Sequence, residues 1–127
     1  MLAVILAILL TGSSLCVAAD ETDSSPPPLS PEQMVRVRQL VQSVQTEATL
    51  LQARLDQRQR ELTDVYTAYK LDEPRADKLQ AEIVELQRLL LANHHRMQVE
   101  LRAIVSAERF EFLRRRLAYV AASAAAK

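Results

Sequence analysis

The sequence predicts an all-α protein, built around one long antiparallel helical hairpin with a short hooked helix at its C-terminal end. Ala, Leu, Gln, Glu and Arg dominate after residue 30, and all five are good helix formers. The only glycine, Gly12, lies near the N-terminus, so the body of the chain lacks the residue that tight turns and bulges favour. Apolar residues recur at steps of three and four along two long stretches, which is the spacing of a helical seam.

Residues 1–19 are predicted to be a signal peptide. They carry no charged side chain, and the apolar run from Leu2 to Leu10 has the length of a signal-peptide core but is short for a membrane span. Val17, Ala18 and Ala19 suit a signal peptidase, so we expect cleavage after Ala19 and a periplasmic protein. Because no Lys or Arg precedes the apolar run, retention as an inner-membrane anchor is the alternative.

Residues 20–28, with the sequence DETDSSPPP, are predicted to form a flexible tether, because they are polar and end in three prolines. The hairpin domain is expected to span residues 29–118. Its first helix has a clear start: Ser30 is a favoured N-cap, Pro31 suits the first helical position, and Gln33 lies three residues after the cap, where it closes a capping box.

Two amphipathic stretches supply the arms of the hairpin. The apolar seam of the first arm consists of Val37, Val41, Val44, Ala48, Leu51, Leu55, Leu62, Val65 and Tyr69. Arg58 interrupts this seam, and a kink or short break before residue 50 is one alternative for so long a helix. Asp72 and Pro74 mark the start of the second arm. Its stripe consists of Leu79, Ile83, Leu86, Leu90, Met97, Leu101 and Ile104, widened by Val84, Leu89 and Leu91. Two such helices joined by a short loop bury their seams by folding back on each other.

The last helix begins as the first one does. The segment from Val105 to Phe110, with the sequence VSAERF, again places a Ser cap after an apolar residue and an acidic residue in the first turn. Phe110, Leu113 and Leu117 then predict a short amphipathic helix, and the Ala-rich residues 119–127 are expected to fray as a tail.

These two helix starts resemble the LTxxQ-motif family of periplasmic stress proteins, a heavy-metal-resistance family that includes Spy and CpxP and is related to the metal sensors CnrX and ZraP. The first motif reads Leu29-Ser30-Pro31-Glu32-Gln33, and the second reads Val105-Ser106-Ala107-Glu108-Arg109, with Arg in place of Gln. The resemblance implies a hooked helical hairpin that forms a homodimer and catalyses no reaction. It also implies one of two activities: metal sensing for a membrane partner, or binding of unfolded protein as a chaperone or stress-sensor modulator.

The metal-sensing branch of the family is poorly matched. The metal ligands of that branch are two His one turn apart, a Glu, and a His-x-x-x-Met motif. Of the five positions of this chain that align with these ligands, four hold a residue that cannot reproduce the ligand. Those positions hold Asp20, Ser24, Val41, Met97 and Leu101. Met97 lies on the apolar stripe and is expected to fill the core.

His94 and His95 are the only histidines, and adjacent helical residues point about 100° apart, so they do not chelate one ion as an i, i+4 pair does. We therefore predict no cofactor and keep His94, His95 and Met97 as weak metal candidates. The alternative is weak binding of a divalent metal through one His with a neighbour such as Glu100, or across a dimer.

Arginine is concentrated late in the chain, although the chain as a whole is neutral, with 16 basic and 16 acidic side chains. We define the basic face as Arg96, Arg102, Arg109, Arg114, Arg115 and Arg116. Only Glu100, Glu108 and Glu111 accompany it, so this region has an excess of positive charge. Such a face suits acidic or unfolded protein segments, whereas the alternative is an ordinary solvated helix surface. Nucleic acid is disfavoured by export and by zero net charge.

No nucleophile, phosphate loop or His-x-x-x-His pattern suggests catalysis, so we predict that the chain is not an enzyme. The leading hypothesis is a periplasmic stress accessory protein and homodimer that binds unfolded proteins, or a membrane sensor or anti-sigma partner. One alternative is a membrane-anchored periplasmic heavy-metal sensor with a non-standard metal site. A second alternative is a structural coiled-coil spacer.

Overall fold

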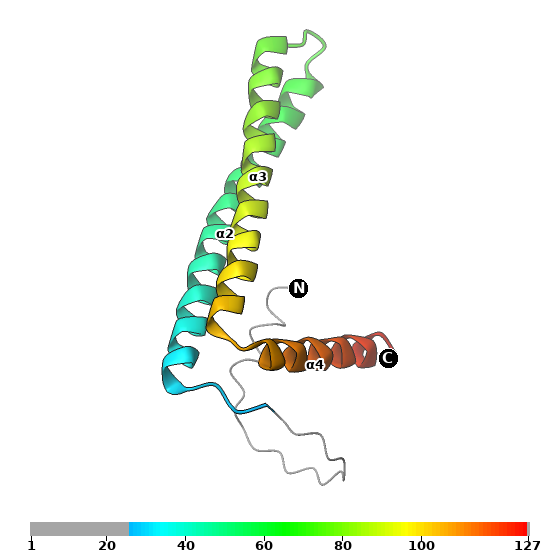
Figure 1. Ribbon diagram of the computed structural model, residues 1–127. Coiled ribbons are helices and arrows are strands. Elements are labelled where there is room, and N and C mark those ends of the chain that lie inside the picture. The colour runs from blue at the N-terminus through cyan, green and yellow to red at the C-terminus, as the bar shows by residue number, and fades with distance from the viewer. Residues whose placement is uncertain (1–25, 127) are drawn as a thin grey trace.

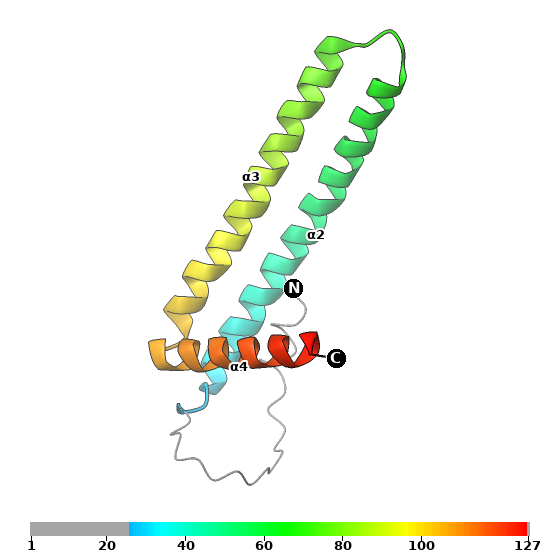
Figure 2. The same ribbon diagram turned by 90° about the vertical axis from the view of Figure 1, so that its right-hand side faces the viewer.

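The computed structural model describes residues 26–126, and within them the chain forms three helices and no strand. α2 spans Pro31–Thr67, α3 spans Glu73–Ile104 and α4 spans Ala107–Ala125. α2 and α3 lie side by side and antiparallel, and α4 turns away crosswise from one end of this hairpin (Figures 1 and 2). The all-α hairpin with a hooked last helix is therefore confirmed. The predicted signal peptide and most of the tether lie outside the described residues.

The start of α2 confirms the capping box. The Ser30 hydroxyl oxygen accepts a hydrogen bond from the Gln33 backbone N–H at 3.1 Å, and the Gln33 side-chain oxygen accepts one from the Ser30 N–H at 2.9 Å. Pro31 lies in the first turn, where its missing N–H leaves no helical bond unmade. Two of the backbone donors that a helix start leaves free are thus satisfied by this local sequence.

α2 is continuous through residue 50, so the alternative of a break there is not observed. The prediction that Tyr69 belongs to the seam is wrong, because α2 ends at Thr67 and Tyr69 lies in the loop with its side chain fully exposed. The chain leaves the helix earlier because it must reverse direction before Asp72. The Asp72 carboxylate accepts a hydrogen bond from the Arg75 N–H at 3.2 Å and caps α3.

The larger apolar core lies at the base of the hairpin, the end at which α2 begins and α3 ends. Its buried members come from both arms and from the residue after α3: Val37, Leu40, Val41, Val44, Met97, Ile104 and Val105. Leu29, Leu101 and Phe110 pack against it from the edges. Met97 is buried, which confirms its expected place in the core. The segment before α2 and the first turn of α4 are therefore held to the same base core.

A second, smaller core closes the tip of the hairpin, where Val65 packs with Ala76 and Leu79. Arg58 lies between the base core and the tip core. Its guanidinium pairs with Glu61 one turn along α2 at 3.0 Å and with Glu82 of α3 at 2.7 Å. The seam that the sequence shows interrupted at Arg58 is thus joined there by an ion pair between the two helices.

Two residues expected to widen the stripe of α3 instead face outward. Val84 is 64% exposed and Leu91 is 72% exposed. They lie seven positions apart, so they share one side of α3, opposite the seam that contacts α2. The expectation that they join the seam is wrong, because α3 has only one helix packed along its length and α2 covers only its inner side.

α4 begins as predicted, with the Ser106 hydroxyl accepting a hydrogen bond from the Arg109 N–H at 3.2 Å. It is longer than expected. The helix continues to Ala125, so most of the Ala-rich segment that was expected to fray is helical. Alanine has the highest helix propensity of all residues, and its run here extends the helix without help from tertiary packing.

The base of the hairpin is closed by a hydrogen bond that we call the Gln33 bridge. While its side-chain oxygen caps Ser30, the Gln33 side-chain nitrogen donates to the carbonyl of Ile104 at 3.1 Å. Ile104 is the last residue of α3, and its carbonyl is one of those that a helix end leaves unpaired. One amide therefore joins the start of α2 to the end of α3.

The Gln33 bridge predicts that Gln33→Glu and Gln33→Ala both destabilise the protein. Glu still accepts from Ser30 but has no hydrogen to donate to Ile104, whereas Ala loses both bonds. We expect a loss of about 1 kcal/mol for Gln33→Glu and about 2 kcal/mol for Gln33→Ala, measured by urea unfolding. Gln59→Ala, on the exposed side of α2, is the control and should leave the unfolding midpoint unchanged. A Gln33→Glu variant as stable as the parent would contradict the role of the bridge.

Candidate functional site

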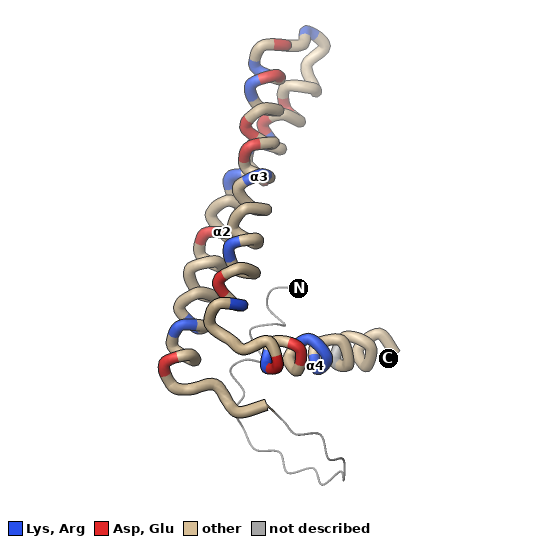
Figure 3. The backbone as a smooth tube through the Cα atoms, in the orientation of Figure 1, with Lys and Arg blue, Asp and Glu red and all other residues tan. Residues whose placement is uncertain are grey.

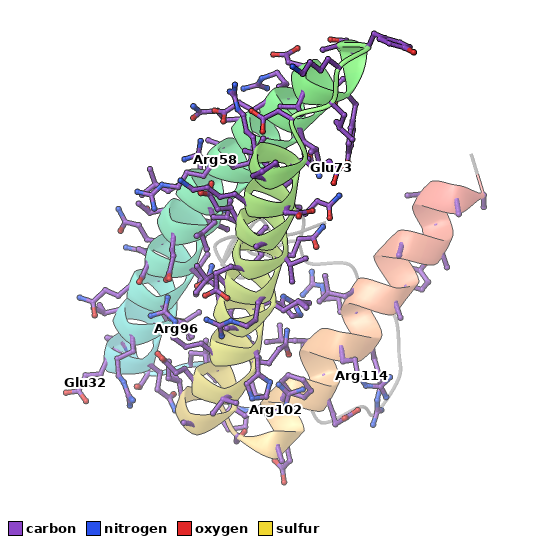
Figure 4. All side chains as sticks on the ribbon, turned by 90° about the horizontal axis from the view of Figure 1, so that it is seen from above. Glu32, Arg58, Glu73, Arg96, Arg102 and Arg114 are labelled. Atoms are coloured by element: carbon purple, nitrogen blue, oxygen red, sulfur yellow. The ribbon has the colours of Figure 1, made fainter. Side chains whose placement is uncertain are left out.

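The six arginines of the predicted basic face do not form one surface. Arg96 points across the hairpin, where its guanidinium donates to Glu47 of α2 at 2.8 Å and to the Asn93 side-chain oxygen at 3.0 Å. Figure 4 shows Arg96 beside both arms of the hairpin and Arg102 where α3 meets α4. The ion pair with Glu47 partly neutralises Arg96. Arg96 therefore joins the two helices.

Asn93 is a buried polar residue that the sequence analysis missed as part of the hairpin seam. It is 4% exposed, and its side-chain nitrogen donates to the backbone carbonyl of Val44 at 2.9 Å. Its oxygen accepts the hydrogen bond from Arg96, so both ends of the amide are satisfied. The spacing of Leu90, Asn93 and Met97, in steps of three and four, is the sequence signal that places this residue on the seam.

Arg102 and Arg109 lie against the aromatic rings of α4. The guanidinium carbon of Arg102 lies 4.3 Å from the centre of the Phe110 ring, and that of Arg109 lies 5.5 Å from the centre of the Phe112 ring. Both distances are in the range of cation–π attraction. Arg102 thus helps to fix the first turn of α4 against α3. Each of these two guanidinium groups has one side covered by a phenyl ring.

Arg114, Arg115 and Arg116 are exposed and form the open part of the basic face. Arg114 lies on α4, beyond the junction with α3 where Arg102 lies (Figure 4), and its guanidinium pairs with Glu111 at 2.9 Å. Arg115 and Arg116 make no ion pair with any residue in the part of the chain that the structure describes. The charges of α4 lie in its first half, and the second half carries none (Figure 3). This run of cations therefore stands at the middle of α4.

Arg109 also marks a difference between the two motifs. Gln33 accepts a hydrogen bond from its cap residue, but an arginine has only donors and cannot accept from the Ser106 N–H. α4 accordingly has the Ser106 half of a capping box without the other half. The Nε of Arg109 is buried and has no hydrogen-bond partner among residues 26–126. The second motif thus holds its helix less firmly than the first.

The predicted metal candidates do not converge. His94 and His95 are both exposed on α3, whereas Met97 is buried in the base core with 3% of its surface exposed. No group of three or more His, Cys, Asp or Glu side chains gathers at a point within residues 26–126. A thioether in the base core reaches a solvent ion only if that core opens.

Two grooves run between the arms. One, of 340 Å³, lies near the base between Arg36 and Ser43 of α2 and Glu100 of α3. The other, of 690 Å³, lies beside Arg58 and Glu82, in the region between the two cores. Glu85 lines the second groove, and the hydrogen bonds that Arg88 donates to it hold the pKa of this carboxyl below its usual range. Both grooves mix positive and negative side chains, so neither has the single sign that selects a charged ligand.

None of the helices within the described residues is long and apolar enough to cross a membrane. The family model described as heavy-metal resistance matches residues 13–111, which include both helix-start motifs, α2, α3 and the first turn of α4. No curated protein and no solved structure matches the chain. Because the family match covers more than half of the sequence, it confirms the resemblance drawn from the two motifs: the chain belongs to the heavy-metal-resistance family.

Proposed function

We propose that this protein acts in the periplasm by binding protein partners, as a chaperone or as a modulator of a membrane sensor. Membership of its family points to a heavy-metal-resistance-related periplasmic protein, and hence to export. The family consists of metal-resistance and sensor-type proteins that are generally not enzymes. The observation that carries the proposal is the run of exposed arginines, Arg114 to Arg116, on a helix that leaves the hairpin.

α4 offers an unfolded chain two kinds of contact. Arg115 and Arg116 offer charge and hydrogen-bond donors to acidic side chains and backbone carbonyls. Phe112, Leu113 and Leu117 are half-buried residues of the same helix and add apolar surface. Arginine stems cover apolar surface while their heads stay in water, so mixed segments of an unfolded protein match such a helix. Binding of this kind is weak, broad and sensitive to salt.

We also propose that the protein is a homodimer that uses the outward side of α3. In the middle of α3, Leu86 and Leu90 are half-buried toward α2, while Val84 and Leu91 are exposed on the opposite side beside the charged Arg88. Large exposed apolar side chains that share one side of a helix are often covered by a partner. A second copy meeting this side along a two-fold axis covers the same residues on both chains.

Metal sensing is the second candidate function, because the matching family is described by heavy-metal resistance. The exposed side chains of His94 and His95 are its most accessible candidates, with Glu100 about one and a half turns further along α3. The two histidines are adjacent on α3 and so point to different sides of the helix, where neither has a second histidine beside it. Such a site would be completed by a second chain.

The partner-binding proposal predicts that the protein suppresses the light scattering of a client that aggregates on unfolding. The double substitution Arg115→Ser, Arg116→Ser should reduce this suppression several-fold, because it removes the two exposed cations of α4 that make no ion pair within residues 26–126. Arg36→Ser, Arg38→Ser removes the same charge from α2 and is the matched control. If the parent protein leaves aggregation unchanged, or if the two double variants behave alike, the proposed role of α4 is wrong.

The dimer proposal predicts that Leu91→Glu shifts the protein from dimer to monomer, because it buries a charge at the centre of the interface. Light scattering coupled to size-exclusion chromatography measures the mass directly. Leu50→Glu is the control, since Leu50 is also exposed, at 58%, but lies on α2. A monomeric parent protein, or a Leu91→Glu variant that remains dimeric, rules out this interface.

The metal candidate is tested by isothermal titration with zinc, nickel, cobalt and copper. On the partner-binding proposal we expect no binding tighter than about 1 μM, which corresponds to about 8 kcal/mol. Binding tighter than this that disappears in His94→Ala but persists in the Arg115→Ser, Arg116→Ser variant would establish the metal candidate in place of the first. If the protein binds neither metal nor client, the remaining hypothesis is that it is a structural coiled-coil spacer.

A further inference from the structure

Within residues 26–126, the contact of α4 with the hairpin is made at its start. α2 and α3 pack along their length, whereas α4 contacts the base core through Phe110 and then extends away crosswise (Figure 1). Its 19 residues give it a length of about 28 Å at about 1.5 Å per residue. Most of this length therefore does not pack along α2 or α3, although Phe112, Leu113 and Leu117 are half-buried.

The side chains of α4 are those of a helix that lies on a surface. Phe112, Leu113 and Leu117 are half-buried apolar residues beyond the first turn, and Tyr119 is 75% exposed. By helical periodicity, Phe112 and Leu113 flank Arg116 on one side of the helix. Arginine in such a position keeps its stem in the apolar layer and its head among polar groups. A helix of this composition suits the boundary between the headgroups and the acyl chains of a membrane.

The polar groups on the side of α4 that carries Arg116 are guanidinium groups, which bind anions. Arg109 and Arg116 lie seven positions apart and so share a side of α4. The buried Nε of Arg109 has no acceptor among residues 26–126, although its guanidinium rests on the Phe112 ring. A phosphate oxygen is a strong acceptor for a guanidinium N–H. The buried Nε of Arg109 is out of reach of a headgroup, so the exposed guanidinium of Arg116 is the group on this side that an anionic headgroup would meet.

The position of α4 in the fold agrees with such a role. Leu29 and Phe110 both pack against the base core, so the N-terminal part of the chain enters the domain at the end where α4 begins. The tip of the hairpin, with Tyr69, lies at the far end (Figures 1 and 2). α4 therefore leaves the hairpin at the same end as the described N-terminal residues 26–30.

We propose that α4 binds the surface of a membrane containing anionic phospholipid, with its arginines on the phosphates and its apolar residues in the boundary layer. This role is separate from the proposed binding of protein partners. A second copy of α4 is a poor occupant, because it sets arginines against arginines. An acidic polypeptide matches the arginines but finds no charge on residues 117–126, which a lipid boundary covers without charge pairing.

The chain contains no tryptophan, so one substitution gives a unique fluorescent reporter. The experiment uses the full chain with Tyr119→Trp on α4 and, separately, with Tyr69→Trp at the tip, where Tyr69 is fully exposed. Each is titrated with vesicles of phosphatidylglycerol, with vesicles of phosphatidylcholine, and with polyglutamate. Emission wavelength and quenching by acrylamide report whether the tryptophan enters an apolar layer.

We expect phosphatidylglycerol vesicles to shift the emission of Trp at position 119 to the blue and to protect it from acrylamide, with little change at position 69. Comparing the two positions separates binding by α4 from attachment through the N-terminal segment, which would hold both variants on the vesicle. Phosphatidylcholine should give a much smaller shift, and added salt should reduce the shift with phosphatidylglycerol.

The charge requirement is tested in the Tyr119→Trp background. Arg114→Ser, Arg115→Ser, Arg116→Ser should abolish most of the shift, whereas the same triple change at Arg36, Arg38 and Arg60 on α2 should retain it. No shift at position 119, equal shifts at positions 119 and 69, or a shift with polyglutamate alone would overturn the proposal. Because client aggregation is not measured here, these outcomes are independent of the partner-binding test.

Discussion

The structure depends on the single seam between α2 and α3. Each arm has one helical neighbour, so only one side of each can be buried, and the core is a narrow row of side chains with Val44 at its most buried point, 1% exposed. Such a seam supplies little apolar area for each residue that is ordered. Its two apolar cores lie at the base and at the tip, and the charged Arg58 stands between them. Within residues 26–126, no other helix consequently packs along the outer sides of the arms or along most of α4.

A seam of aliphatic side chains alone does not fix how far one helix slides along the other, because one small apolar residue packs much like the next. Three polar contacts between the arms supply that register. The Gln33 bridge ties the base, Asn93 donates to the carbonyl of Val44 farther up, and Arg58 pairs with Glu82 toward the tip. A shift of one helix along the other would separate Asn93 from the Val44 carbonyl and Arg58 from Glu82. Arg96 is hydrogen-bonded to Glu47 and to Asn93, so it reinforces the contact between Asn93 and α2. For the same reason it is not part of the exposed basic face.

The sequence was enough to predict the helices, their starts and the hairpin, because capping and apolar spacing are local and the chain has no glycine after Gly12. It did not predict the end of α2, since Tyr69 fits the apolar spacing and only the need to reverse direction removes it from the helix. The sequence also did not predict that the arginines of the basic face have different contacts. Whether an arginine reaches across a seam, as Arg96 does, or rests on a ring, as Arg102 does, depends on partners that are distant in sequence.

The starts of α2 and α4 differ in one residue of the motif, Gln33 in the first and Arg109 in the second, and this difference changes how firmly each helix is attached. At the first start, Gln33 is both acceptor and donor, so it completes the cap of α2 and reaches Ile104. At the second start, Arg109 can only donate, so α4 keeps the Ser106 half of its cap and is held to the base mainly by Phe110 beneath Arg102. The same change adds a cation to the helix that carries Arg114, Arg115 and Arg116. α4 is thus held to the hairpin at its first turn and carries its charges along the next two, whereas α2 is tied to the end of α3 by both a complete cap and the Gln33 bridge.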